Sequence, residues 1–335
     1  MRTKIKIMYL ILAAVVIFSI GFLFWVARKN ASVDGKPIVW GVSWSASYAR
    51  YFGLDWKKVY TNILDDLNVR ALRIPAYWEE IEPSRGKFNF DDLDWQLMEA
   101  KKRGTFVILA VGKKLPRWPE CHVPEWAKNL NKKELDRAIL QYLAKVVNRY
   151  KSYSSVKYWQ IENEPFFPFG EKGCEKISRD FVKQEIALVK SLDNRPVVIT
   201  DSGELSTWIS TASFADILGI SMYRVSWNKL FGYLFYPVFP AFYRERANLI
   251  KYLVSDVIVT ELQVEPWAPS SIKLLPLEEQ YKSMNISRFY DNIEFARRTG
   301  FKEIYLWGIE WWYWLKEAHN NSEFWEASKK LFVKP

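Results

Sequence analysis

Two glutamates stand where apolar, strand-like segments of the chain end. Glu164 follows the segment 156–162 in an Asn-Glu-Pro turn, and Glu261 lies at the end of the segment 256–262. Proline has no backbone N–H group, so it stops the pairing of the first segment and leaves the carboxylate at its end. Two such carboxyl groups can cleave a glycosidic bond, because one protonates the leaving oxygen while the other attacks the sugar or activates water.

Apolar runs and helical patterns alternate along almost the whole chain. The expected strands are residues 38–43, 69–75, 105–111, 156–162, 196–201, 216–222, 256–262 and 303–308. The helical patterns that follow them are at about residues 56–67, 91–103, 132–149, 177–192, 207–214, 244–253, 277–298 and 323–332. This alternation predicts an α/β fold, a (β/α)₈ TIM barrel. An open doubly wound sheet would carry a glycine-rich phosphate turn after its first strand, where this chain has Ser-Trp-Ser.

The barrel fixes where the two glutamates should lie. Enzymes with this fold carry their catalytic groups at the C-terminal ends of the strands. Glu164 and Glu261 are expected at the ends of the fourth and seventh strands, so their carboxyl groups should face the mouth of the barrel from opposite sides. A separation of about 5–5.5 Å would give retention through a covalent glycosyl-enzyme, and one of about 6.5–9.5 Å would give inversion.

These motifs resemble those of clan A of the glycoside hydrolases. The resemblance rests on the Asn163-Glu164-Pro165 turn after a tryptophan-containing fourth strand and on Thr260-Glu261 at the end of the seventh. It extends over about residues 38–333. It implies a retaining mechanism in which Glu164 is the acid/base and Glu261 the nucleophile, while Asn163 holds the 2-hydroxyl group of the sugar.

Three further positions match the clan. The resemblance implies that Arg73 keeps the nucleophile ionised, that Tyr223 donates a hydrogen bond to it, and that Trp307 forms the floor of the subsite for the cleaved sugar. The implied roles agree with elementary chemistry. A cation and a hydroxyl donor lower the pKa of a nucleophilic carboxylate, whereas burial and an opposing negative charge raise the pKa of the acid.

The family within the clan is indicated by two segments. Residues 81–90 resemble a segment of family 42 and family 1 enzymes, and residues 159–164 resemble the fourth strand of the β-galactosidase families 35 and 42. Family 5 enzymes usually carry a histidine two residues before the strand-six tyrosine, where this chain has Ser221. The resemblance therefore favours a β-galactosidase- or β-glucosidase-like enzyme over a family 5 cellulase, and an endo-β-glycanase remains an alternative.

The chain is 17% aromatic, and aromatic rings stack on the apolar faces of sugars. Trp44 and Trp78 follow the first two strands, and we expect both to bind substrate at the rim together with Glu310. Other candidates at the rim are Tyr77, Trp118, Trp126 and Glu204. Glu162 is expected to pair with a basic side chain behind the site. The apolar segment 230–243 is interpreted as a lid that folds over the barrel or as a segment that packs on the sixth helix. Alternatively, it contacts a bilayer or accepts a lipid-linked sugar.

The N-terminus contains an uncharged apolar run at residues 7–26. A helix of about 20 residues spans ~30 Å, the hydrocarbon thickness of a bilayer. Basic residues before the run favour an N-terminus on the cytoplasmic side. We therefore expect a cytoplasmic stub with a transmembrane signal-anchor at residues 1–29, a linker at 30–37, and an extracytoplasmic barrel at 38–335. A cleaved signal peptide and a secreted barrel are the alternative.

The net charge of +10 is spread along the chain without a basic run or a nucleic-acid motif. It indicates a solvated basic surface or attraction to an anionic surface, and no nucleic-acid partner. No motif indicates a metal, nucleotide or flavin cofactor. Cys121 and Cys174 follow the third and fourth strands and would sit on the same rim. They form either a disulfide or two buried thiols.

Three functions fit these observations. The first is a retaining β-glycosidase with an oligo- or polysaccharide substrate. The second is a transglycosylase, which passes the same covalent intermediate to a sugar instead of water. The third is a membrane-tethered barrel that binds glycans without turnover. The intact pair of glutamates, with Arg73 beside the expected nucleophile, favours an enzyme.

Overall fold

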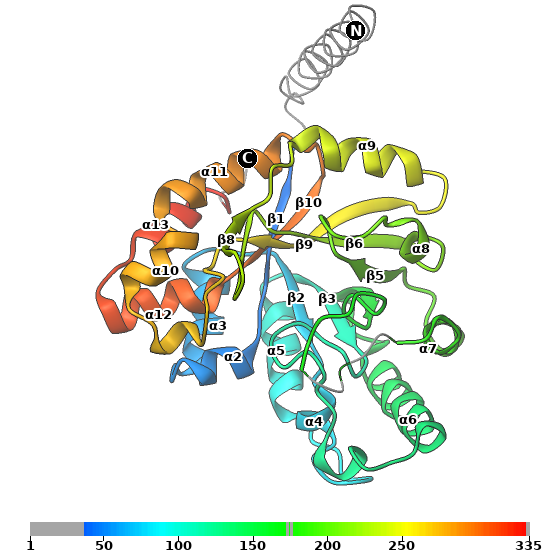
Figure 1. Cartoon of the computed structure of the whole chain (residues 1–335). Helices are drawn as coiled ribbons and strands as arrows, with labels where there is room; N and C mark the ends of the chain where they lie inside the picture. Colours follow the sequence, from blue (N-terminus) through cyan, green and yellow to red (C-terminus); the bar gives the residue numbers. More distant parts are fainter. Residues whose placement is uncertain (1–36, 172–173, 175–176, 333–335) are drawn as a thin grey trace, which may run out of the picture.

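A computed structural model describes residues 37–171, 174 and 177–332. Eight parallel strands close into a barrel in the order β1-β10-β9-β6-β5-β4-β3-β2. They are β1 (Val39–Ser43), β2 (Ala71–Pro75), β3 (Phe106–Val111), β4 (Val156–Ile161), β5 (Val197–Asp201), β6 (Ile217–Met222), β9 (Asp256–Gln263) and β10 (Glu303–Trp307). Helices surround this ring of strands (Figure 1). The prediction of a (β/α)₈ barrel is confirmed.

Helices of very different length connect the strands. They are α2 (Ala46–Tyr51), α3 (Trp56–Asp65), α4 (Trp78–Ile81), α5 (Asp91–Lys102), α6 (Lys132–Tyr150), α7 (Arg179–Leu192), α8 (Ile209–Ala212), α9 (Pro240–Ile250), α10 (Leu277–Ser283), α11 (Ile286–Arg297), α12 (Ile309–His319) and α13 (Glu323–Lys329), with 3₁₀ helices at Glu125–Ala127 and Ile272–Leu274. The longest, α6, begins at a capping box in which Asn131 and Glu134 bond each other's backbone N–H groups. Its apolar side chains recur at helical spacing and are buried.

The strands are buried on both faces. In β3 every residue from Val107 to Val111 is fully buried. Such continuous burial is expected where helices cover the outside of a parallel sheet and side chains fill the inside. The rigid ring of strands therefore positions whatever side chains stand at its C-terminal end.

Two helical regions differ from the sequence prediction. The helix expected at about residues 277–298 is two helices, α10 and α11, because Asn285 caps the second one: its side-chain oxygen accepts a hydrogen bond from the backbone N–H of Arg288 at 3.0 Å. The second difference is α12, which starts directly after β10, where the pattern predicts a loop. Residues 309–315 of α12 are all buried, so this helix has no polar face in its first two turns and no amphipathic period to reveal it.

The apolar segment 230–243 contributes to a β-hairpin and to the start of α9. The hairpin pairs β7 (Val225–Asn228) with β8 (Gly232–Phe235). Tyr233 donates a hydrogen bond from its hydroxyl group to the carboxylate of Glu279 at 2.8 Å, which ties the hairpin to α10. The helix α9 begins at Pro240, earlier than expected, because proline suits the first turn of a helix. Contact of this segment with a bilayer stays a prediction.

Cys121 and Cys174 form a disulfide, so the first of the two alternatives for these residues holds. Among the helices of the described residues, none combines the length and apolar character that a membrane span requires. The uncharged run 7–26 and nearly all of the linker lie outside the described residues. The signal-anchor therefore stays a prediction from the sequence.

Candidate active site

A cavity of about 800 Å³ opens at the C-terminal ends of the barrel strands. Its wall is made of side chains from the ends of several strands and from the loops that follow them. Both predicted carboxylates, Glu164 after β4 and Glu261 in β9, line this cavity. Two groups from distant parts of the chain thus meet in one site, as the barrel prediction requires.

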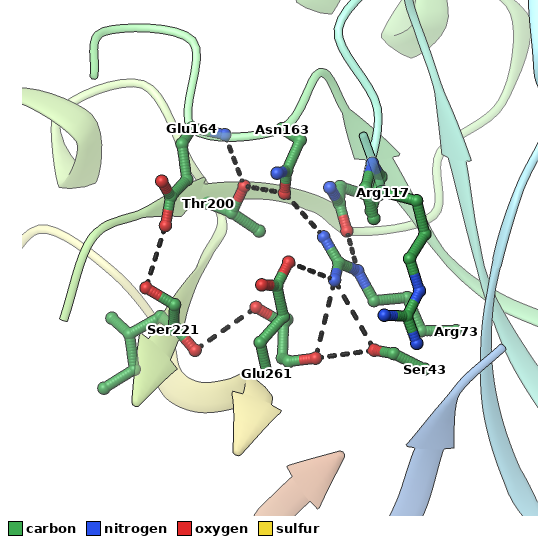
Figure 2. A network of polar contacts seen from close by, with 12 residues as sticks. Ser43, Arg73, Arg117, Asn163, Glu164, Thr200, Ser221 and Glu261 are labelled. Carbon is green, nitrogen blue, oxygen red and sulfur yellow. Dashed lines mark hydrogen bonds and ion pairs between the residues drawn. The ribbon is translucent and has the colours of Figure 1, made fainter. Parts of the chain in front are cut away.

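Glu261 is held by a cation and a hydroxyl group. The Nη1 atom of Arg73 donates to its Oε1 at 2.7 Å, and the hydroxyl group of Tyr223 donates to its Oε2 at 3.1 Å. Figure 2 shows the guanidinium group of Arg73 directed at this carboxylate. Both partners are those that the resemblance implies, and together they hold both oxygens of the carboxylate.

Arg73 lies at the centre of a buried polar network. Its Nε donates to Gln160 Oε1 at 2.7 Å, and its Nη2 donates to Asn163 Oδ1 at 2.7 Å (Figure 2). The hydroxyl group of Thr200 also donates to Asn163 Oδ1, at 3.1 Å. The amide oxygen of Asn163 therefore faces the network. Its Nδ2 group donates to Glu120 at 3.1 Å and, because an amide nitrogen carries two hydrogens, keeps a second one for a ligand of the cavity that Asn163 lines.

The carboxyl group of Glu164 is held by a hydroxyl group and not by an arginine, and the residue is half-buried. Its Oε1 accepts a hydrogen bond from the hydroxyl group of Ser221 at 2.8 Å. Burial, and then the negative charge of Glu261, raise the pKa of Glu164 to about 8. The backbone of Glu164 is left-handed, with φ of 43°, and its carbonyl oxygen accepts from the buried ammonium group of Lys114 at 3.0 Å. Non-glycine residues keep such a conformation when the surrounding structure imposes it, and functional sites are where they cluster.

Trp307 lines the cavity, but another side chain covers one face of its ring. The guanidinium carbon of Arg117 lies 3.7 Å from the centre of the Trp307 ring and 3.8 Å from the centre of the Tyr48 ring. Arg117 also forms ion pairs with Glu265 and Glu310. At the place of the expected subsite floor, Arg117 therefore lies between the rings of Trp307 and Tyr48.

Glu310 is placed differently from the prediction. It is fully buried at the start of α12, where it accepts from the backbone N–H of Ser45 at 2.6 Å and pairs with Arg117. It does not line the cavity, so its expected direct contact with substrate is wrong in this structure. Its carboxylate instead supports Arg117 from behind.

Trp44 and Trp78 are not at the rim either. Both are almost completely buried and neither lines the cavity. The indole N–H of Trp44 donates to Gln96 at 2.9 Å, and that of Trp78 donates to Glu82 at 2.8 Å. Their rings pack between the barrel and its helices, because the two loops turn back into α2 and α4 immediately after the strands.

The remaining candidates divide between wall and interior. Tyr77, Trp118 and Glu204 line the cavity, whereas Trp126 does not. Glu162 accepts hydrogen bonds from two successive backbone N–H groups, at 3.1 and 2.6 Å, and forms no ion pair with a described basic side chain. The expected basic partner of Glu162 is therefore replaced by backbone amides.

Several wall residues escape the sequence analysis. Glu120 lies in the loop after β3, Glu265 and Trp267 lie beyond the end of β9, and Trp227 lies in the hairpin. Glu120 and Trp267 stand away from strand ends, which are the signal that identifies the other site residues. Glu265 follows β9 by two residues, but the sequence already has Glu261 at that strand end, so the second glutamate is overlooked. No group of His, Cys, Asp and Glu side chains in the described part of the chain is arranged to hold a metal ion.

Fold and site together, a parallel barrel with two carboxyl groups lining one cavity at its mouth, are similar to the arrangement of clan A glycosidases. Comparison with known proteins agrees. The family model of glycosyl hydrolase family 10 matches residues 56–187, a part of the chain that runs from α3 into α7 and contains Arg73, Asn163 and Glu164.

Solved structures with the same fold come from several glycosidase families. Xylanase 10B from Thermotoga maritima is 17% identical, with 84% of each chain covered and a TM-score of 0.54. A GH5_18 protein from Bifidobacterium longum subsp. longum is 14% identical, with 81% of this chain and 70% of that one covered and a TM-score of 0.56. A β-galactosidase from Halorubrum lacusprofundi is 14% identical, with 81% and 52% covered and a TM-score of 0.54. These matches confirm the resemblance to clan A.

Proposed function

We propose that the protein is a retaining glycoside hydrolase that cleaves β-glycosidic bonds of an oligo- or polysaccharide by double displacement. The observation that carries this proposal is the difference between the two carboxyl groups of one cavity. Glu261 is held by an arginine and a tyrosine hydroxyl group, whereas Glu164 is half-buried and has a raised pKa. One group is thus suited to be a nucleophile and the other to be an acid.

In the first step, Glu164 donates its proton to the glycosidic oxygen while a carboxylate oxygen of Glu261 attacks the anomeric carbon. The bond from this carbon to the leaving oxygen breaks, and the aglycone departs with the proton. Arg73 and Tyr223 position Glu261 for the attack. Asn163 offers its Nδ2 group to the hydroxyl group at carbon 2 of the sugar.

In the second step, the acid becomes a base. Formation of the ester removes the negative charge of Glu261, which is the largest cause after burial of the raised pKa of Glu164. The pKa of Glu164 should then fall, so that its carboxylate can accept a proton from water. Water attacks the anomeric carbon, releases Glu261, and leaves the sugar with its original configuration.

The pH dependence follows from the same group. Because Glu164 must be protonated in the free enzyme and its pKa is about 8, kcat/KM should decline about tenfold per pH unit above that value. Steady-state rates with an aryl β-glycoside between pH 5 and 10 measure this limb. A plateau that continues to pH 10 would assign the acid to another group.

The proposal is tested by trapping the intermediate. Incubation with activated 2-deoxy-2-fluoro-glycosides, followed by peptide mass mapping, should place one sugar on Glu261. The variant Glu261→Ala should lose turnover and regain part of it with azide, giving the glycosyl azide of inverted configuration. Label on a different carboxyl group would overturn the assignment of the nucleophile.

The same experiment separates the alternatives. A transglycosylase would also be labelled but would transfer the sugar to an added acceptor in preference to water. A silent glycan-binding barrel would bind the reagent reversibly without label. Two carboxyl groups held in such different ways favour catalysis over binding alone.

The sugar is the open part of the proposal. The sequence motifs favour a β-galactosidase- or β-glucosidase-like enzyme, while the family model that matches is that of family 10, and structures with this fold include xylanases and β-galactosidases. We propose a β-linked glycan substrate. A panel of aryl β-xylosides, glucosides, galactosides and mannosides, followed by the matching polysaccharides, distinguishes these cases and exo from endo action.

We further propose that the barrel is displayed outside the membrane on a signal-anchor. Support comes from the uncharged run 7–26 and the basic residues before it. Expression of the full chain followed by fractionation and protease treatment of intact cells tests the proposal. Activity in the culture medium with loss of the first residues would instead favour a cleaved signal peptide.

A further inference from the structure

The cavity contains a third carboxyl group close to the proposed catalytic pair. Glu120 is 7% exposed, lines the cavity, and comes from the loop between β3 and α6. Its Oε2 accepts a hydrogen bond from the Nδ2 atom of Asn163 at 3.1 Å. Its Oε1 accepts no hydrogen bond from a described residue and is not fully buried. Because Glu120 lines the cavity, this oxygen faces the open space of the cavity.

The loop around Glu120 is built to hold this side chain in place. Glu120 donates its backbone N–H to the carbonyl oxygen of Arg117 at 2.8 Å, and its own carbonyl oxygen accepts from the N–H of Leu115 at 2.8 Å. The next residue, Cys121, is joined by the disulfide to the loop after β4. Gly170 of that second loop lies so close that a Cβ atom on it would approach the Cβ atom of Glu120 to 3.2 Å.

Glu120 is also in electrostatic contact with the catalytic pair. Burial, and then the charge of Glu261, raise the pKa of Glu120 to about 8, and the charge of Glu120 in turn contributes to the raised pKa of Glu164. No described basic side chain forms an ion pair with it. Lys114 and Arg73 attract its charge only without direct contact. A buried carboxyl group without a direct ion pair is expensive to keep, so a purely structural role explains it poorly.

We propose that Glu120 recognises the substrate by binding the sugar whose glycosidic bond is cleaved. One of its oxygens holds Asn163, and the other binds a ring hydroxyl group adjacent to the hydroxyl group at Asn163. This inference rests on the proposed function and specifies its substrate: the sugar in this subsite carries neighbouring free hydroxyl groups at carbons 2 and 3.

The charge of the cavity narrows the substrate further. The carboxyl groups that line it are Glu120, Glu164, Glu204, Glu261 and Glu265. Among the described residues that line the cavity, Arg117 is the one arginine, and it already forms ion pairs with two glutamates. A sugar that carries a carboxylate or sulfate would meet acids without an unpaired cation, so the subsite takes an uncharged sugar.

The test uses deoxy substrates. The probe is the aryl β-glycoside that the wild-type protein cleaves fastest, together with its 2-deoxy and 3-deoxy analogues. Glu120→Ala should lower kcat/KM for the parent glycoside by on the order of 10- to 100-fold, because a hydroxyl group of the sugar then enters the site without its hydrogen-bond partner. For at least one deoxy analogue the loss should be less than about threefold, because the hydroxyl partner is absent in both wild type and variant. Glu120→Gln should recover part of the activity.

A matched control separates recognition from stability. Glu82→Gln alters another buried carboxylate, one that accepts from Trp78 and from the backbone N–H of Gly86 and does not line the cavity. It should leave the ratio of parent to deoxy rates unchanged. Equal losses on the parent and both deoxy glycosides in Glu120→Ala would overturn the inference. Failure of the proposed function is distinguishable, since the wild type would then cleave no glycoside and take up no fluorosugar label.

Discussion

Replacement of the proposed acid should leave the stability of the protein unchanged at acidic pH and increase it at alkaline pH. Glu164→Gln has the shape of the protonated carboxyl group and keeps an oxygen that can accept from Ser221. It cannot ionise. The wild-type carboxyl group, in contrast, is partly desolvated and feels the negative charge of Glu261, so the folded protein opposes its ionisation.

The magnitude follows from the pKa of Glu164, which burial and Glu261 raise from the ordinary value of 4.5 to about 8. Below pH 4.5 both the folded and the unfolded chain hold the proton, and its contribution to stability is fully present. Between these two values the unfolded chain releases the proton while the folded chain keeps it, so stability falls by about 1.4 kcal/mol per pH unit. The loss is complete above the folded pKa and amounts to about 5 kcal/mol as an upper limit.

Thermal unfolding between pH 4 and pH 9 measures this effect. The variant should match the wild type near pH 4 and exceed its Tm by about 5–10 °C near pH 8.5, since a chain of this length gains about 1–2 °C per kcal/mol. Glu278→Gln, which alters an exposed glutamate in α10, should show no such pH-dependent difference. A constant difference across the pH range, or a variant less stable than the wild type at pH 8.5, would refute the raised pKa and with it the assignment of the acid.

Three further changes test other parts of the site. Tyr223→Phe removes the hydroxyl donor to the proposed nucleophile and should lower kcat by about 10- to 100-fold with little change in Tm; an unchanged kcat would exclude the tyrosine from the reaction. Replacing both Cys121 and Cys174 with Ser opens a link across 53 residues and should lower the free energy of unfolding by about 4 kcal/mol, measured by urea titration; equal midpoints would contradict this. Gly308→Ala would bring a Cβ atom within 2.5 Å of Glu265 at a φ of 130°, and should cost about 3 kcal/mol or more; a fully stable variant would show that this contact relaxes freely.

The strands and the groups at their ends could be predicted from the sequence because both depend on local rules. Apolar runs identify buried parallel strands, and the barrel rule brings their last residues to one mouth. Arg73 and Glu261 lie within the last three residues of their strands, and Asn163, Glu164 and Tyr223 follow strands closely. The structure gathers all of them in one network or cavity.

The rest depends on chain reversals that no local pattern encodes. Trp44 and Trp78 follow strands just as closely, but short helices begin beside them and turn both rings into the interior. Glu120 stands far from a strand end in sequence and reaches the cavity through the folded loop that the disulfide joins to its neighbour. Glu310 belongs to a helix without a polar face, so neither its helix nor its burial has a sequence signal.

Arg73 explains why the proposed nucleophile and the expected sugar-binding amide act as one unit. Its side chain is completely buried, and its three nitrogen atoms donate to acceptors on separate residues: Gln160, Asn163 and Glu261. Lysine could not replace it, because a single ammonium group cannot reach three acceptors in the plane that the guanidinium group sets. The same cation therefore holds the attacking oxygen and orients the amide that faces the sugar. A shift of either group must move the other, so Arg73 fixes the proposed nucleophile and the proposed sugar-binding amide relative to each other.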